Sequence, residues 1–132
     1  MDAQARSQIF HVVFSTKGRK GVLYEDVRDL VLAQFAKVAT EKSIEILEVE
    51  AIHDHVHLLQ LLKPGQKLSA VMHDLKGASA RAVFLAFPEL RLDIHSDSFW
   101  RRGYGERPVP RNQVAVVRRY IRTQDERPLR HE

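Results

Sequence analysis

The pattern of apolar and polar positions predicts four elements in the first half of the chain. Residues 9–15 (IFHVVFS) are apolar and β-branched and predict a strand that ends at the turn-like run TKGRKG. Residues 24–42 repeat apolar positions at helical spacing, with acidic residues in the first turn, and predict a helix. Residues 44–52 alternate as a strand with a change of phase, which indicates a β-bulge. Residues 55–62 predict the next strand, and the short gap between the two makes them an antiparallel hairpin.

The second half begins with a Pro-Gly break. A helix is expected over residues 69–87 and is stopped by the proline that follows. Residues 98–109 predict one or two short strands, and Asn112 is a suitable N-cap for a last helix over residues 113–125. In the helix 69–87 the residues expected to face inward are Val71, Met72, Leu75, Ala78, Ala82 and Leu85.

The order of these elements is strand, helix, strand, strand, helix, strand and terminal helix. This is the split βαβ pattern of a ferredoxin-like α+β fold, an antiparallel sheet backed by two helices, here with an added C-terminal helix. At 132 residues the chain has the length of one domain, and we expect residues 1–132 to form it. In this topology the strand 55–62 lies centrally in the sheet.

The composition excludes some classes of protein and favours one class of partner. The chain has no cysteine, no apolar stretch that would cross a bilayer and no N-terminal signal segment, so we expect a cytoplasmic protein without disulfides or a membrane partner. Its net charge is +4, and its basic residues cluster, which favours a nucleic acid as partner. The clusters are Lys17, Arg19 and Lys20; Arg101, Arg102 and Arg107; and Arg118, Arg119 and Arg122.

The candidate chemistry begins in the run AIHDHVHLLQLL. Because successive side chains of a strand alternate across the pleat, His55 and His57 are expected on one side. There they would present two imidazoles to one metal ion or one phosphate. Val56 and Leu58 would face the other way, into the core.

Near the C-terminus, Tyr120 and Gln124 stand four residues apart and share one face of the expected last helix, the candidate cover for the histidine face. Two imidazoles and the amide oxygen of Gln124 would form an open three-ligand metal site, with positions left for phosphate oxygens and water. A cation there would clamp and polarise a scissile phosphate. Tyr120 is then the candidate nucleophile, because nearby positive charge favours its phenolate.

Five stretches of sequence carry a family resemblance: VVFSTKGRK, AIHDHVHLL, DLKGASAR, FWRRGYG and VRRYIRTQ. In this order they resemble the small single-tyrosine HUH transposases of the TnpA type, IS200-like enzymes that move insertion sequences as single-stranded DNA. The resemblance covers about residues 9–124.

The resemblance implies roles for four residues. His55 and His57 match the pair that binds a divalent ion, Mg²⁺ or Mn²⁺, and Gln124 matches the third ligand. Tyr120 matches the tyrosine that attacks the DNA phosphate, becomes linked to a 5′-phosphate and frees a 3′-hydroxyl. The family also implies a homodimer, in which the tyrosine helix can complete the partner's site, and binding to DNA hairpins at the ends of the element.

Several alternatives stay open at this stage. His53 is in phase with the histidine pair and would either reach the metal or be exposed at the end of the hairpin. Trp100 and Tyr104 would either stack on unpaired bases or pack in the core. The residues expected to bind DNA are Lys17, Arg19, Lys20, Lys76 and Arg81.

Two other classes of function also remain. A decayed or domesticated hairpin-binding protein would need neither Tyr120 nor metal to bind DNA. A metal-dependent phosphodiesterase would use water as its nucleophile and would form no covalent adduct.

Overall fold

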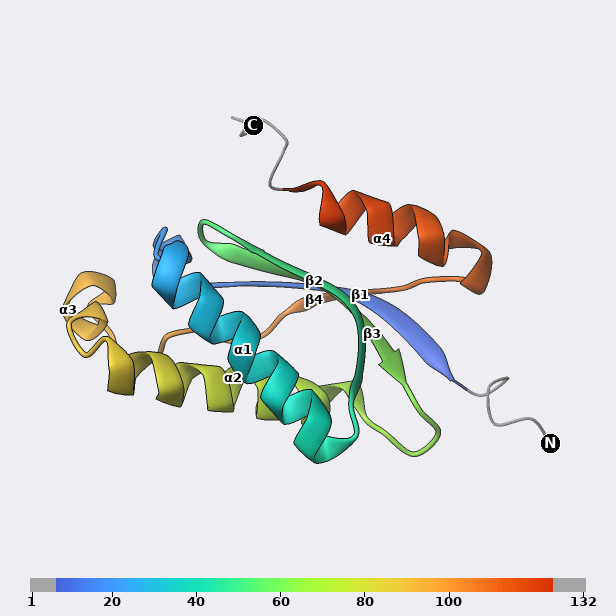
Figure 1. Cartoon of the computed structure of the whole chain (residues 1–132), viewed down its shortest axis with the longest axis horizontal. Coiled ribbons are helices and arrows are strands. Elements are labelled where there is room, and N and C mark those ends of the chain that lie inside the picture. Colours follow the sequence, from blue (N-terminus) through green and yellow to red (C-terminus); the bar gives the residue numbers. More distant parts are fainter. Residues whose placement is uncertain (1–6, 125–132) are drawn as a thin grey trace.

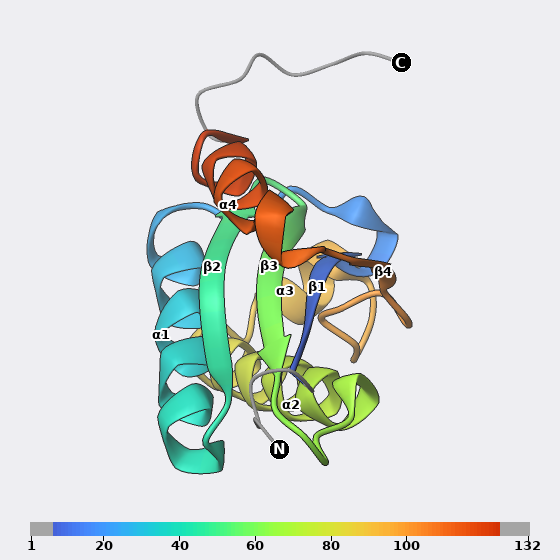
Figure 2. The same ribbon diagram turned by 90° about the vertical axis from the view of Figure 1, so that its right-hand side faces the viewer.

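Four strands form one antiparallel sheet in the part of the chain that the computed structural model describes, residues 7–124. The expected hairpin is present, and the expected bulge appears as a shift of register between Ile46 and Glu48. In the sheet order β2-β3-β1-β4, β3 lies inside the sheet (Figure 2). The strands are β1 (Gln8–Ser15), β2 (Glu45–Ile52), β3 (His55–Leu62) and β4 (Gly105–Pro108).

Helices cover both faces of this sheet. α1 (Glu25–Lys42) and α2 (Leu68–Ala86) pack on one face, and α4 (Val114–Arg122) crosses the other (Figures 1 and 2). The predicted fold class, a ferredoxin-like α+β sheet with an added C-terminal helix, is confirmed. The remaining short elements are η2 (Lys17–Arg19), α3 (Leu90–Ile94) and η3 (Arg111–Gln113). In the described residues, no helix is long and apolar enough to span a membrane.

The alternation of side chains along the strands separates two hydrophobic clusters. Val56 and Leu58 of β3 are fully buried in the larger cluster, together with Phe35 of α1 and Leu75 of α2. The next residue of β3, Leu59, belongs to a smaller cluster on the opposite face. The buried members of this smaller cluster are Ile9, Leu59, Val109 and Ile121. The apolar contact between α4 and the sheet is therefore small, and polar side chains of β1 and β3 lie beside it.

The segment 98–109 contains less strand than the sequence predicts. Its regular strand is limited to Gly105–Pro108, and Trp100 adds an isolated bridge to Thr16. Gly103 interrupts the segment with a positive φ of 86°, a conformation that turns the chain and suits glycine. The short α3 was not expected, since five residues are too few to show a helical period.

Two details of the helices also differ from the expectation. Leu85, expected to face inward, is 86% exposed, and Val83 and Phe84 are buried instead, because the stripe of α2 that meets the core is displaced by one position in its last turns. Asn112 does not cap the last helix: it lies in η3, where Gln113 N–H bonds to the carbonyl of Pro110, and α4 begins only at Val114. The expected helix end at residue 125 lies outside the described residues.

Candidate active site between the sheet and α4

His55 and His57 lie on the same face of β3, as the strand alternation predicts, and this face carries α4. Their ring centroids are 5.0 Å apart. His57 is 8% exposed and His55 is half-buried, so one ring is enclosed by the protein and the other borders the surface. Because β3 is flanked by strands on both sides, its backbone holds the two imidazoles in a fixed relation.

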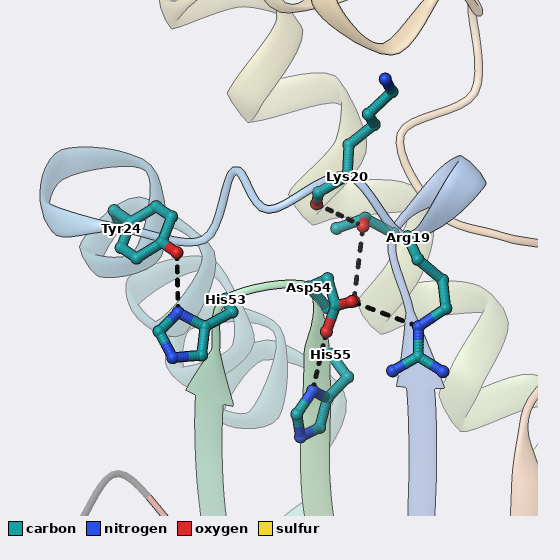
Figure 3. A network of polar contacts seen from close by, with 7 residues as sticks. Arg19, Lys20, Tyr24, His53, Asp54 and His55 are labelled. Atoms are coloured by element: carbon teal, nitrogen blue, oxygen red, sulfur yellow. Dashed lines mark hydrogen bonds and ion pairs between the residues drawn. The ribbon is translucent and has the colours of Figure 1, made fainter. Parts of the chain in front are cut away.

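The outer histidine is held by a carboxylate. Nδ1 of His55 donates to Oδ1 of Asp54 at 2.9 Å, and Nε of Arg19 donates to Oδ2 of the same carboxylate at 3.2 Å (Figure 3). Burial alone would raise the pKa of Asp54, but the hydrogen bonds from His55 and Arg19 outweigh it and hold that pKa below its ordinary value. The ionised carboxylate fixes the proton of His55 on Nδ1, which leaves the lone pair of the neutral ring on Nε2.

The inner histidine is held by another histidine that the sequence analysis did not identify. Nε2 of His11, on β1, lies 2.9 Å from Nδ1 of His57, and the two rings are stacked. Burial, followed by the neighbouring rings of His55 and His11, lowers the pKa of His57 to about 4. Burial and the charge of Arg107 lower the pKa of His11 as well. Both rings are therefore neutral at neutral pH, and a neutral imidazole can bind a metal ion.

Tyr120 brings α4 into the same cluster. Its ring centroid lies 5.8 Å from that of His57 and 6.1 Å from that of His11, edge-on to both. Ile121, the next residue, is fully buried against the sheet and anchors this turn of the helix. Tyr120 itself is 40% exposed, so its phenol remains accessible from solvent.

Gln124 lies in the turn that follows α4. Its Nε2 donates to the backbone carbonyl of Tyr120 at 3.0 Å, which ties the amide to the same end of the helix. Among the described residues, Gln124 forms no hydrogen bond with His55 or His57. Within residues 7–124, moreover, no three His, Cys, Asp or Glu side chains are grouped so as to hold a metal ion.

Two hollows meet at His57. One, of about 500 Å³, contains His55 and is bordered by cationic side chains; the other, of about 550 Å³, contains His11 and Tyr120. His57 therefore separates a cationic hollow from a hollow that holds the phenol. The cationic side chains of the first hollow are Arg19, Arg101 and Arg102.

The residues expected to bind DNA are not all near this site. Lys17 and Lys20 are exposed in and beside η2, and Arg19 of the same turn reaches the site through Asp54. Nζ of Lys76 is bonded to two backbone carbonyls of the segment 101–103. Arg81 is exposed between α1 and α2, on the opposite side of the sheet from the histidines.

The structure places two of the residues for which the sequence left alternatives open. Nδ1 of His53 forms a hydrogen bond of 2.7 Å with the hydroxyl of Tyr24, so the ring points toward the start of α1 and away from the pair (Figure 3). Trp100 is 6% exposed, packs against Phe14 and Phe99, and donates from Nε1 to the hydroxyl of Ser79. Trp100 is therefore a core residue and does not stack on bases. Tyr104 is half-buried and borders the hollow that contains His55.

Comparison with protein families and curated proteins gives a consistent result. The model of the family described as transposase IS200 like matches residues 4–124. The ISDra2 transposase TnpA of Deinococcus radiodurans is 31% identical over 118 residues, which are 89% of this chain and 84% of that protein. The transposase for insertion sequence element IS200 of Salmonella typhimurium is 33% identical over 115 residues, 87% of this chain and 75% of that protein.

Solved structures show the same fold. A crystal structure of a candidate transposase from Deinococcus radiodurans matches with a TM-score of 0.72 and 31% identity, over 89% of this chain and 91% of that chain. A REP-associated tyrosine transposase, solved bound to a REP hairpin, matches with a TM-score of 0.65 over 88% of this chain and 65% of that chain. Since only 13% of its residues are identical, this second likeness is one of fold.

Proposed function

This chain belongs to the family of IS200-like transposases, and we propose that it cuts and rejoins single-stranded DNA of an insertion sequence through a covalent link to Tyr120. The observation that carries this proposal is the edge-on packing of the Tyr120 ring against His57, 5.8 Å between centroids. It places an accessible phenol beside the histidine pair, at the junction with a hollow bordered by arginines.

The proposed reaction uses a divalent ion, Mg²⁺ or Mn²⁺, and the donor atoms fit one. Asp54 binds Nδ1 of His55 and His11 binds Nδ1 of His57, so the Nε2 atoms are the ones left for an ion. Histidine ligands generally donate their second N–H to a carboxylate or another acceptor, as His55 does here. Gln124 uses its amide nitrogen in the bond to Tyr120, so its oxygen is the atom left as a third ligand. A bound ion would polarise the scissile phosphate and offset the charge on its oxygens.

The nucleophile accounts for rejoining as well as cutting. The phenol oxygen of Tyr120 attacks the phosphorus and loses its proton; a tyrosine–phosphate bond forms, the bond from phosphorus to the 3′-oxygen breaks, and that oxygen leaves as a 3′-hydroxyl. The 5′-phosphotyrosine keeps a phosphodiester bond, so a second 3′-hydroxyl can attack it and restore the DNA strand. A water nucleophile would lose that bond and leave only cut DNA.

We propose that the partner is single-stranded DNA with hairpins and that the protein acts as a homodimer. The chain has a net charge of +4, and one relative of the same fold was solved with a REP hairpin. In the single chain Tyr120 already contacts His57 of that chain, so exchange of the tyrosine between subunits remains a prediction. Mixing Tyr120→Phe with His57→Ala tests it, since a shared site restores activity in the mixed dimer and a site within one chain does not.

The central experiment is covalent trapping. With Mn²⁺ or Mg²⁺ and a single-stranded oligonucleotide that carries the element's end hairpin, we expect a protein–DNA adduct on a denaturing gel. Mass spectrometry should locate it at Tyr120, and EDTA should abolish it. Tyr120→Phe should form no adduct but still bind the DNA, because it loses one hydroxyl and no charge.

Tyr24→Phe is the matched control, because it removes a hydroxyl from another exposed tyrosine, one that faces His53 instead of His57. It should form the adduct like the wild type. Cleavage by Tyr120→Phe at the wild-type rate would contradict the proposal and point to a water-based phosphodiesterase. Binding without any cleavage by the wild type would point to a DNA-binding protein without catalytic activity.

A further inference from the structure

The ammonium of Lys76, on α2, is hydrogen-bonded within the protein. Its Nζ donates to the backbone carbonyls of Arg101 and Gly103, both at 2.9 Å. These two carbonyls flank Arg102. A lysine ammonium has three donor positions, so two of the three are used inside the protein.

The surroundings hold the ammonium in this place. Nζ lies over the Phe14 ring, 5.7 Å from its centroid, where the face of the ring attracts a cation. A half-buried ammonium that already binds two carbonyls would have to give up these bonds to reach a phosphate. The contacts therefore indicate a structural role for this charge.

The segment that Lys76 binds is fixed at its other side by β1 and η2. Arg101 N–H donates to the carbonyl of Ser15 at 2.9 Å, and Lys17 N–H donates to the carbonyl of Phe99 at 2.9 Å. α2 adds a second attachment one turn after Lys76, where the Ser79 hydroxyl accepts from Trp100. After Arg102 the chain turns at Gly103 with a φ of 86°, and the Lys76 bonds close this turn.

We propose that Lys76 is a positioning residue that holds residues 101–103, the arginine loop, as one wall of the cationic hollow. The loop contributes Arg101 and Arg102 to the hollow that contains His55 and His57. Lys76 thus acts on bound DNA through the loop and makes no contact with a phosphate. This inference rests on the proposed binding of single-stranded DNA at that hollow, and it assigns the phosphate contacts to the loop arginines.

The first test needs no DNA. Lys76→Met keeps most of the apolar stem and removes the ammonium, so hydrogen exchange of the backbone amides in the arginine loop should accelerate by about 10-fold or more, since local openings are governed by such contacts. Exchange in α4 should stay unchanged. Lys37→Met is the control, because it removes the same charge from an exposed position of α1. Loop exchange equal to that of the wild type would overturn the proposal.

The second test is a double-mutant cycle with fluorescent oligothymidylate as the single-stranded probe. Lys76→Met should weaken binding by roughly 10-fold, within the range of coupling between contacting residues, but by less than about 2-fold when Arg102 is already replaced by Gln. A direct phosphate contact would instead give the same factor in both backgrounds and overturn the proposal. If the wild type fails to bind the probe, the proposed binding of an unpaired strand at the cationic hollow fails, while the exchange measurement still decides the role of Lys76.

Gly103→Ala keeps the inference testable should Lys76→Met fail to fold. An added Cβ at Gly103 meets no atom within 4 Å, so its effect comes from the positive φ of 86° alone. We expect Gly103→Ala to weaken probe binding as Lys76→Met does, although it removes no charge. Unchanged binding by a folded Gly103→Ala protein would show that the shape of the loop does not matter.

Discussion

The two faces of the sheet differ in what they bury, and the alternating side chains of β3 contribute to both. On the face under α1 and α2, Val56 and Leu58 are fully buried in the larger hydrophobic cluster. On the face under α4, His55 and His57 of the same strand lie beside two hollows. Alternation along one strand therefore gives rigid support to imidazoles that remain open to a ligand.

The difference lies in how each face is covered. α1 and α2 contribute two long helices, whereas α4 has nine residues and buries only Ile121. This short cover leaves the two hollows beside the histidines open. We therefore expect substitutions on the face under α4 to reduce activity. Substitutions on the face under α1 and α2 should instead reduce stability.

The largest effect should come from the histidine face. His55→Ala should reduce adduct formation on the order of 100-fold or more, the scale on which removing one electrostatic group from an active site acts. Its free energy of unfolding should change by only about 1 kcal/mol, since it loses one half-buried hydrogen bond to Asp54. Rates of adduct formation and urea denaturation measure the two quantities. Near-normal rates with His55→Ala would break the assignment of chemistry to this face.

The opposite face should show the opposite behaviour. Leu58→Ala removes a fully buried side chain from the core under α1 and α2, and should lower the free energy of unfolding by about 2–5 kcal/mol. Below its melting temperature, the folded fraction should still form the adduct at a rate within about 10-fold of the wild type. A stable Leu58→Ala protein without activity would show that the two faces are not independent.

A smaller effect follows from the pH dependence of stability in metal-free protein. His57 has an unfolded pKa near 6.5 and a folded pKa of about 4, so the unfolded state binds more protons between these values. The stability that depends on the neutral His57 ring is fully present above pH 6.5 and is lost as the pH falls toward 4. At 1.36 kcal/mol per unit of pKa difference, the loss amounts to about 3 kcal/mol at most. Urea denaturation in EDTA measures it.

Two variants isolate this contribution. His57→Gln should flatten the loss of stability between pH 6.5 and about 4, whereas His73→Gln, at an exposed position of α2, should keep the wild-type dependence. Equal curves for His57→Gln and the wild type would mean that the enclosed ring is not kept neutral by its burial.

Local patterns were sufficient for much of this molecule. The helix and strand periods predicted α1, α2 and the β2–β3 hairpin, and alternation alone placed His55 and His57 on one side of β3. Those patterns depend on residues close together in the sequence, so the sequence of a single chain is enough to identify them.

Features set by distant pairing were not predictable in the same way. His11 meets His57 only because β1 pairs with β3, and nothing in the run IFHVVFS indicates which strand will lie beside it. Lys76 binds carbonyls more than twenty residues further along the chain, so its sequence motif indicated charge but not its contact. The role of Trp100 was ambiguous for the same reason, because Ser79, which accepts its hydrogen bond, lies on α2 and 21 residues earlier in the chain.

The smallest expected effect concerns the ionic attachment of α4. Oε1 of Glu48, on β2, accepts from Arg118 at 3.4 Å and from Arg122 at 3.1 Å. These pairs are partly exposed, so Glu48→Gln should change the global free energy of unfolding by less than about 1 kcal/mol. Because α4 buries little apolar surface, the loss should appear locally, as hydrogen exchange in α4 that is a few-fold faster.

Glu50→Gln is the matched control, since Glu50 lies two residues further along β2 and pairs with Arg28 of α1 instead. It should leave exchange in α4 unchanged. Added salt should accelerate exchange in α4 of the wild type and have little effect on Glu48→Gln, because screening weakens a pair that the variant no longer has. If Glu48→Gln leaves α4 exchange unchanged at low salt, the apolar contact around Ile121 is enough to hold the tyrosine helix, and the cover of the histidine face is firmer than its short length indicates.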